Sequence, residues 1–119
     1  MKSFKERFEF DSRKEEAERI ISKYPSRIPV IVEKNPKCNN LPHIDRSKFL
    51  VPGDLLISEF YVVIRKRIKD LKSHEALFFF TGDDSMMAKP SATLSSVYEE
   101  MKSDDGFLYM QYSGESTFG

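Results

Sequence analysis

Two kinds of short apolar segment alternate along this chain of 119 residues. One segment has apolar residues at i, i+3, i+4 and i+7, as on one face of an α-helix: Ala17, Ile20, Ile21 and Tyr24. Residues 28–32 and 77–80 are instead continuous runs rich in β-branched or aromatic side chains, which predict strands. The longest apolar run is about five residues, whereas a membrane-spanning helix needs roughly 18. The chain is therefore expected to fold by packing short helices against short strands.

Four helices are predicted. Phe4 and Phe8 indicate a short first helix, and Pro25 ends the second, for which Asp11 or Ser12 can serve as N-cap; Ser12 and Glu15 have capping-box spacing. A central helix capped by Asp54 carries an apolar stripe, with Leu56 and Val63 beside it: Ile57, Phe60, Ile64 and Ile68. A further helix opens at Pro90-Ser91, with another stripe: Leu94, Val97, Tyr98 and Met101.

Four strands are predicted at residues 28–32, 48–51, 77–80 and 107–112, with a loop at residues 35–47 and a polar tail from Ser113. Pro29 cannot donate to a strand ladder, so the first strand should lie at an edge of the sheet or have Pro29 at its start. Two strands, a long helix and then further strands form an α+β pattern. A β-grasp sheet fits this order, which leaves several α+β folds open.

The length and composition indicate one cytosolic or nuclear domain. With 39% hydrophobic residues the chain can form one core, and its start has no apolar signal segment. The single cysteine excludes an internal disulfide. The net charge is zero, but residues 1–69 hold sixteen Lys and Arg against ten Asp and Glu, and residues 70–119 hold three against nine. Basic residues on one face would attract acidic partners; a solvated surface of mixed sign is the simpler interpretation.

No catalytic, cofactor or metal site is predicted. Cys38 lies in a prolyl loop without a neighbouring base, so we expect a surface cysteine and not a nucleophile. His43 and His74 lack partners at metal-ligand spacing and are expected to be solvated. The five glycines are scattered and form no phosphate-binding loop. These features argue against an enzyme.

Nucleic-acid binding is also disfavoured. Residues 65–67 are Arg-Lys-Arg and lie close to Phe60 and Tyr61, a combination that could form a small basic, aromatic patch. The pI near 6.7 and the absence of a recognition motif argue against it. Phe60 also belongs to the apolar stripe of the central helix, so it is expected in the core.

Several stretches, taken together and in order, resemble the autophagy-related protein 8 family of ubiquitin-like modifiers, which includes the GABA-receptor-associated and microtubule-associated light chain proteins. They are Arg27-Ile28-Pro29-Val30-Ile31, Phe49-Leu50-Val51-Pro52 after Arg46, the helix Phe60 to Ile68 with its Ile-Arg-Lys-Arg-Ile ending, Asp105 to Tyr109, and Tyr112 to Gly119. The resemblance covers nearly the whole chain, and the tail is its most specific part.

The resemblance implies a single ubiquitin-like domain over residues 1–119: two N-terminal helices in 1–24, a β-grasp core in 25–112 and a flexible conjugation tail in 113–119. It implies a cytoplasmic modifier that is joined through Gly119 to phosphatidylethanolamine on autophagosomal membranes. An E1-like activating enzyme, an E2-like conjugating enzyme and a processing and deconjugating cysteine protease would recognise Thr117 and Phe118. Glycine suits the narrow clefts of such enzymes because it has no Cβ.

The resemblance also implies a groove for cargo receptors with aromatic-x-x-aliphatic motifs, which add a strand to the second strand of the sheet. The aromatic pocket would be Glu16, Ile20, Pro29, Ile31, Lys48, Leu50 and Phe107. The aliphatic pocket would be Phe49, Val51, Pro52, Leu55, Phe60 and Val63. Arg27, Lys48 and Arg67 would contact acidic residues that flank the motif.

Two other functions remain open from the sequence. One is an adaptor that binds peptides but is never conjugated, for which a terminal glycine would be unnecessary. The other is a modifier that is joined to a protein lysine instead of a lipid.

Overall fold

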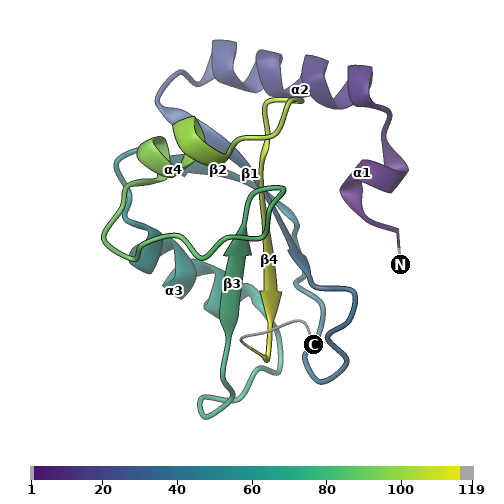
Figure 1. Cartoon of the computed structure of the whole chain (residues 1–119), viewed down its shortest axis with the longest axis vertical. Helices are drawn as coiled ribbons and strands as arrows, with labels where there is room; N and C mark the ends of the chain where they lie inside the picture. The colour runs from purple at the N-terminus through teal and green to yellow at the C-terminus, as the bar shows by residue number, and fades with distance from the viewer. Residues whose placement is uncertain (1, 116–119) are drawn as a thin grey trace.

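A computed structural model describes residues 2–115 of the chain (Figure 1). Its elements in chain order are α1 (Phe4–Arg7), α2 (Phe10–Lys23), β1 (Arg27–Lys34), β2 (Lys48–Pro52), α3 (Ile57–Arg67), β3 (Phe78–Thr81), α4 (Leu94–Met101) and β4 (Leu108–Ser113). All of the predicted helices and strands are therefore present, with shifted ends.

The strands form one sheet in the order β2-β1-β4-β3. The first and last strands of the chain lie side by side and parallel in its centre, and β2 and β3 pair antiparallel at the two edges. Figure 1 shows α1 and α2 at the top and right of the sheet, and α3 and α4 at its left. This arrangement confirms the predicted α+β, β-grasp fold with two additional N-terminal helices.

Each face of the sheet has its own apolar cluster, because successive strand residues point to opposite faces. Val30 and Val32 of β1 join the larger cluster with α3 and α4. Ile31, between them, joins the smaller cluster, whose other buried members are Phe4, Ala17 and Phe107. The N-terminal helices therefore cover the face opposite to α3 and α4.

The predicted apolar stripes are buried to different extents. Those of α3 and α4 are in the core: Ile57, Phe60, Ile64, Ile68, Leu94, Val97 and Tyr98. In α2, only Ala17 is fully buried, while Ile21 and Tyr24 are 38% and 40% exposed. The short contact face of α2 lies on the sheet, and its remaining apolar residues face solvent.

The prediction that Pro29 lies in an edge strand was wrong, because β1 is central in the sheet. It is the third residue of β1, and the ladder with β4 begins only at the next residue, Val30, opposite Leu108. The N–H of Val32 donates to Ser47 on the β2 side, so by alternation position 29 faces the β4 side. Pro29 thus stands just before the point where that side needs donors, as the strand-start alternative predicted.

The helix starts differ from the prediction. The N-cap of α2 is Glu9, without a side-chain bond, and not Asp11 or Ser12. A capping box occurs instead in α1, between Ser3 and Glu6. Hydrogen bonds from the N–H and hydroxyl of Ser3 lower the pKa of Glu6.

The starts of α3 and α4 are also corrected. The N-cap of α3 is Leu56 and not Asp54, and α4 begins after Thr93, later than the predicted Pro90-Ser91. Leu56 and Thr93 form an isolated antiparallel bridge. The first N–H of α3, from Ile57, donates to Ala92 O at 2.8 Å, and that of α4, from Leu94, donates to Leu55 O at 2.9 Å. Backbone carbonyls thus accept from N–H groups that have no partner within their own helix.

Two predictions at the end of the sheet were wrong. Cys38 is buried, with 7% exposure, and its thiol donates to Asn40 Oδ1 at 3.3 Å, because the loop after β1 folds back onto β4. Within that loop, the Asn35 side-chain amide donates to Gln111 Oε1 at 2.8 Å. Ser113, predicted to begin the tail, is the last residue of β4, is buried and pairs with Phe78.

Candidate functional site

The outer edge of β2 is the place where the predicted groove residues meet. β2 pairs with β1 on one side only and forms an edge of the sheet. In its register, Lys48 lies opposite Ile31 and Leu50 opposite Pro29. Since Val32 N–H bonds to Ser47 on the inner side, the alternation of antiparallel pairing directs the Lys48 and Leu50 carbonyls outward.

Two arginine side chains bond to these outward carbonyls. Arg27 Nη1 donates to Leu50 O at 3.1 Å, and Arg46 Nε donates to Lys48 O at 3.2 Å. Arg27 was predicted as a contact for acidic residues, whereas Arg46 was not predicted as a site residue. A strand that pairs with this edge would compete with both guanidinium groups for the same carbonyl oxygens.

The seven predicted aromatic-pocket residues lie together but differ in exposure. Ile31 and Phe107 are fully buried in the smaller cluster, with Ile20 packed against them, and Pro29 is buried as well. Glu16, Ile20, Lys48 and Leu50 are only partly buried. Lys48 Nζ forms an ion pair with Glu16. A ligand side chain bound here would meet the buried residues as a floor and the ion pair as a rim.

The residues of the predicted aliphatic pocket also divide into buried and exposed ones. Phe49, Val51 and Phe60 are buried in the larger cluster, and the Phe49 and Phe60 rings pack edge to face with centroids 5.6 Å apart. Pro52 and Val63 are exposed, and Leu55 is partly buried. This patch lies between β2 and α3 and offers solvent-facing apolar atoms over a packed aromatic floor.

The three predicted cations all have acceptors within the chain. Besides the contacts of Arg27 and Lys48, Arg67 Nε lies 3.9 Å from Asp45 Oδ1. The side chains of Lys48 and Arg67 are each 40% exposed. Exposed pairs of this kind are weak, about 0–1 kcal/mol, so an acidic ligand could exchange with them at small cost.

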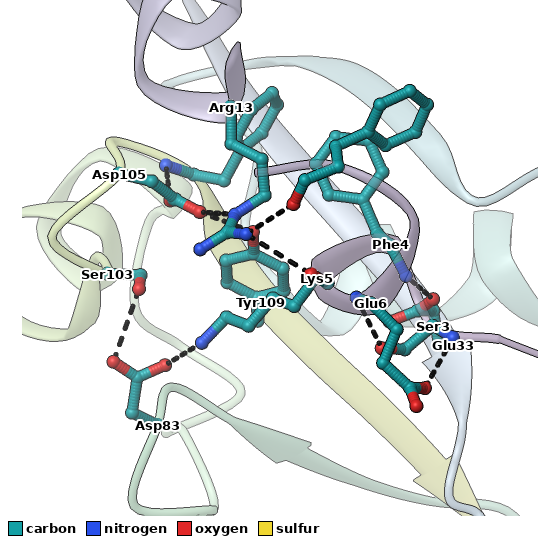
Figure 2. Close-up of polar contacts among 12 residues, drawn as sticks. Ser3, Phe4, Lys5, Glu6, Arg13, Glu33, Asp83, Ser103, Asp105 and Tyr109 are labelled. Carbon is teal, nitrogen blue, oxygen red and sulfur yellow. Dashed lines mark hydrogen bonds and ion pairs between the residues drawn. The ribbon is translucent and has the colours of Figure 1, made fainter. Parts of the chain in front are cut away.

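A buried polar cluster that the sequence reasoning missed fixes the N-terminal helices beside this site (Figure 2). The Asp105 carboxylate accepts from Arg13 Nε at 2.8 Å, from the Tyr109 hydroxyl at 2.5 Å and from Phe107 N–H at 2.9 Å. Burial, followed by the hydrogen bond to Asp105, raises the pKa of Tyr109. The hydrogen bond from Arg13 to Asp105 raises the pKa of Arg13.

Arg13 extends this cluster to α1. Its Nη1 donates to Lys5 O at 3.2 Å and to Phe8 O at 2.6 Å. Figure 2 shows Lys5 reaching in turn to Asp83, which also accepts from Ser103. The only sequence signal for this cluster was an acid before the last strand and an arginine in the second helix, a pairing that spans 92 positions.

The conjugation residues Thr117, Phe118 and Gly119 lie outside the described residues. At Gly114, near the start of the tail, a Cβ would stand 2.7 Å from Asn40 Nδ2, so a larger residue there would require the Asn40 side chain to move. Across residues 2–115, no helix is both long and apolar enough to cross a bilayer, and no three His, Cys, Asp or Glu side chains gather as a metal site.

Comparison with known proteins identifies the family. Residues 12–119 match the family model described as autophagy protein Atg8, ubiquitin-like. The chain is 51% identical to autophagy-related protein 8 of Mycosarcoma maydis, over 98% of this chain and 96% of that protein. It is 52% identical to autophagy-related protein 8 of Schizosaccharomyces pombe and 53% identical to autophagy-related protein 8e of Arabidopsis thaliana, over 98% of this chain and 93% and 92% of theirs. With a β-grasp sheet, two extra N-terminal helices and this similarity along nearly all of its length, the chain belongs to the Atg8 family of ubiquitin-like autophagy proteins.

Proposed function

We propose that this protein acts in autophagy as a modifier, and not as an enzyme, and that it is joined through the carboxylate of Gly119 to phosphatidylethanolamine. In this proposal the unconjugated form is cytoplasmic and the conjugated form is held on autophagosomal membranes by its lipid. Family membership supports the function in autophagy. The residue type at position 119 supports conjugation, because glycine has no Cβ and suits the narrow clefts of enzymes that activate, transfer and release it.

The first test is the mass of the protein recovered from membranes of its own cells. We expect a gain equal to one phosphatidylethanolamine amide at Gly119, and we expect Gly119→Ala to lack it while its far-ultraviolet circular dichroism is unchanged. Mass added at a protein lysine would favour the protein-modifier alternative. An unmodified wild-type protein, soluble even during starvation, would favour the adaptor and refute lipid conjugation.

We also propose that the edge of β2 binds cargo receptors that carry aromatic-x-x-aliphatic motifs. The observation that carries this proposal is that the carbonyls of Lys48 and Leu50 face outward and accept from arginine side chains that a ligand can displace. These carbonyls lie between the partly buried residues of the proposed aromatic pocket and the exposed residues of the aliphatic patch. An added strand would take over these acceptors. Arg27 and Arg46, once displaced, would be free to pair with acidic residues flanking the motif.

The groove is tested with two peptides that differ only in acidic or neutral flanking residues. We expect Arg27→Ala to weaken binding of the acidic peptide by about 0.5–1 kcal/mol, as for a solvent-exposed ion pair, and to leave the neutral peptide nearly unchanged or slightly tighter. Leu50→Ala should weaken both peptides, because Leu50 belongs to the proposed aromatic pocket. Calorimetric titration gives the affinities; equal loss of both peptides in Arg27→Ala would refute the exchange.

Leu50 is a better probe than its neighbour Phe49. Phe49 is 9% exposed and packs on Phe60, so its truncation would cost about 3–5 kcal/mol of stability by leaving a cavity. A matched control is Ile21→Ala, which removes a comparable side chain that is 38% exposed on α2 and is not part of the proposed pocket. It should change neither affinity.

A further inference from the structure

Phe4 packs against buried residues of the proposed aromatic pocket, although it was not predicted as a site residue. Its ring is 2% exposed and packs against Phe107, with centroids 5.2 Å apart and planes at 71°. Phe4, Phe107 and Ile31 belong to one buried cluster. Two of the residues proposed to form the pocket floor therefore pack in one cluster with a side chain of α1.

Phe4 also contacts the rim of the pocket. Lys48 Nζ lies 5.7 Å from the centre of the Phe4 ring while it is paired with Glu16. A cation over an aromatic face is attracted to it, so the ring helps to set where the Lys48 ammonium group rests. Phe4 therefore contacts both Phe107 and Lys48, two residues of the proposed pocket.

Phe4 and the helix α1 that carries it are held firmly in place. The backbone N–H of Phe4 donates to Glu33 Oε2 at 2.8 Å, which ties the start of α1 to β1. Arg13 joins the carbonyls of Lys5 and Phe8 to the buried Asp105 carboxylate. Figure 2 shows these contacts on both sides of α1. Because the helix is fixed at both ends, the Phe4 ring cannot easily yield to a larger ligand.

We propose that Phe4 supports the floor of the proposed aromatic pocket from behind and thereby limits how large an aromatic side chain the pocket accepts. This inference rests on the proposed peptide-binding function. Phe4 is a positioning and size-determining residue, since it acts behind the pocket floor and on Lys48. The N-terminal helix is accordingly part of the specificity of the groove.

The test uses three peptides that are identical except for Trp, Tyr or Phe at the aromatic position. Dissociation constants are measured by calorimetry for the full chain and for Phe4→Ala. We expect the ratio of the Phe-peptide to the Trp-peptide dissociation constant to rise by about tenfold in Phe4→Ala, as for a hydrophobic pocket enlarged by at least one carbon group. A structural role alone would weaken all three peptides by the same factor.

Phe4→Leu is the second variant, since it keeps an apolar side chain in the cluster and preserves folding if the alanine variant unfolds. It should shift the ratio in the same direction by a smaller factor. The matched control is Phe10→Ala, which removes a 42% exposed ring near the start of α2, and it should leave the ratio unchanged. Thermal unfolding followed by circular dichroism verifies that each variant is folded.

The outcomes separate this inference from the function on which it rests. If wild-type protein binds the peptides and the ratio stays the same in Phe4→Leu and in folded Phe4→Ala, the role of Phe4 is refuted and the groove stands. An equal shift in Phe10→Ala would also refute it. If the wild type binds none of the three peptides, the proposed groove is wrong and this inference falls with it.

Discussion

At the scale of single residues, buried tyrosine hydroxyls link the stability of this protein to pH. Burial raises the pKa of four tyrosines: Tyr61, Tyr98, Tyr109 and Tyr112. For Tyr112, whose side chain is fully buried, the pKa rises to about 12. The unfolded chain loses this proton near pH 10, and the folded chain holds it to higher pH. The stabilisation is therefore complete below about pH 10 and is lost as pH rises towards 12.

We accordingly predict that the free energy of unfolding falls steeply above about pH 10, with each such tyrosine contributing about 1.4 kcal/mol per pH unit. Tyr112→Phe should make this slope shallower. It should also cost about 1 kcal/mol at neutral pH, because the Tyr112 hydroxyl donates to Pro42 O at 2.7 Å. Urea unfolding at several pH values measures both effects. With Tyr24→Phe, an exposed tyrosine, as control, an equal slope in the two variants would contradict the prediction.

At the scale of elements, α3 and α4 depend on each other for their first turns. Leu56 and Thr93 are their N-caps and pair as a bridge, and each helix receives a carbonyl from the segment before the other. This explains how a leucine can stand at an N-cap, where Ser, Thr, Asp and Asn are preferred. Patterns of neighbouring residues indicated Asp54 and Pro90-Ser91 as the helix starts. In the structure both helices start later, where each contacts a segment that is distant in sequence.

The side-chain cap of α4 gives a direct test. Thr93 Oγ1 accepts from Ser96 N–H at 3.2 Å. We predict that Thr93→Ala lowers the free energy of unfolding by about 1 kcal/mol, the usual cost of a lost N-cap, and that Ser91→Ala changes it little. Urea unfolding of both variants at neutral pH provides the comparison. A larger loss in Ser91→Ala than in Thr93→Ala would place the cap where the sequence had predicted it.

At the scale of the whole molecule, local patterns predicted which helices and strands form better than they predicted which of them lie side by side. The apolar stripes of α3 and α4 followed from periodicity, the four strands followed from short apolar runs, and the resemblance supplied the β-grasp arrangement. Pro29 left the place of its strand open, because a proline is tolerated wherever its nitrogen needs no acceptor. Only the offset between the β1–β2 and β1–β4 ladders shows why it fits in a central strand.

For the candidate site as well, only part of the residues could be predicted from the sequence. The residues of β2 and α3 came from the resemblance, since they are neighbours in a recognisable motif. Arg46 was missed although its contact, to the Lys48 carbonyl, is local. Phe4 and the Asp105 cluster were missed because each acts through contacts with a distant part of the chain: Phe4 with Phe107, and Arg13 with Asp105. Such contacts leave no periodic or spacing signal in a single sequence.

The parallel pairing of β1 with β4 has a consequence for how the protein is made. Val30 lies beside Leu108, so the centre of the sheet joins residues near opposite ends of the chain. Chains are synthesised from the N-terminus at about 5–20 residues per second, and pairing across such a separation requires closure of a long loop, which slows folding. On the ribosome, β1 and β2 can form a hairpin early, but its inner edge stays open until β4 emerges. The sheet is therefore completed only after β4 has been synthesised, and until then the open edge of β1 can pair with other chains.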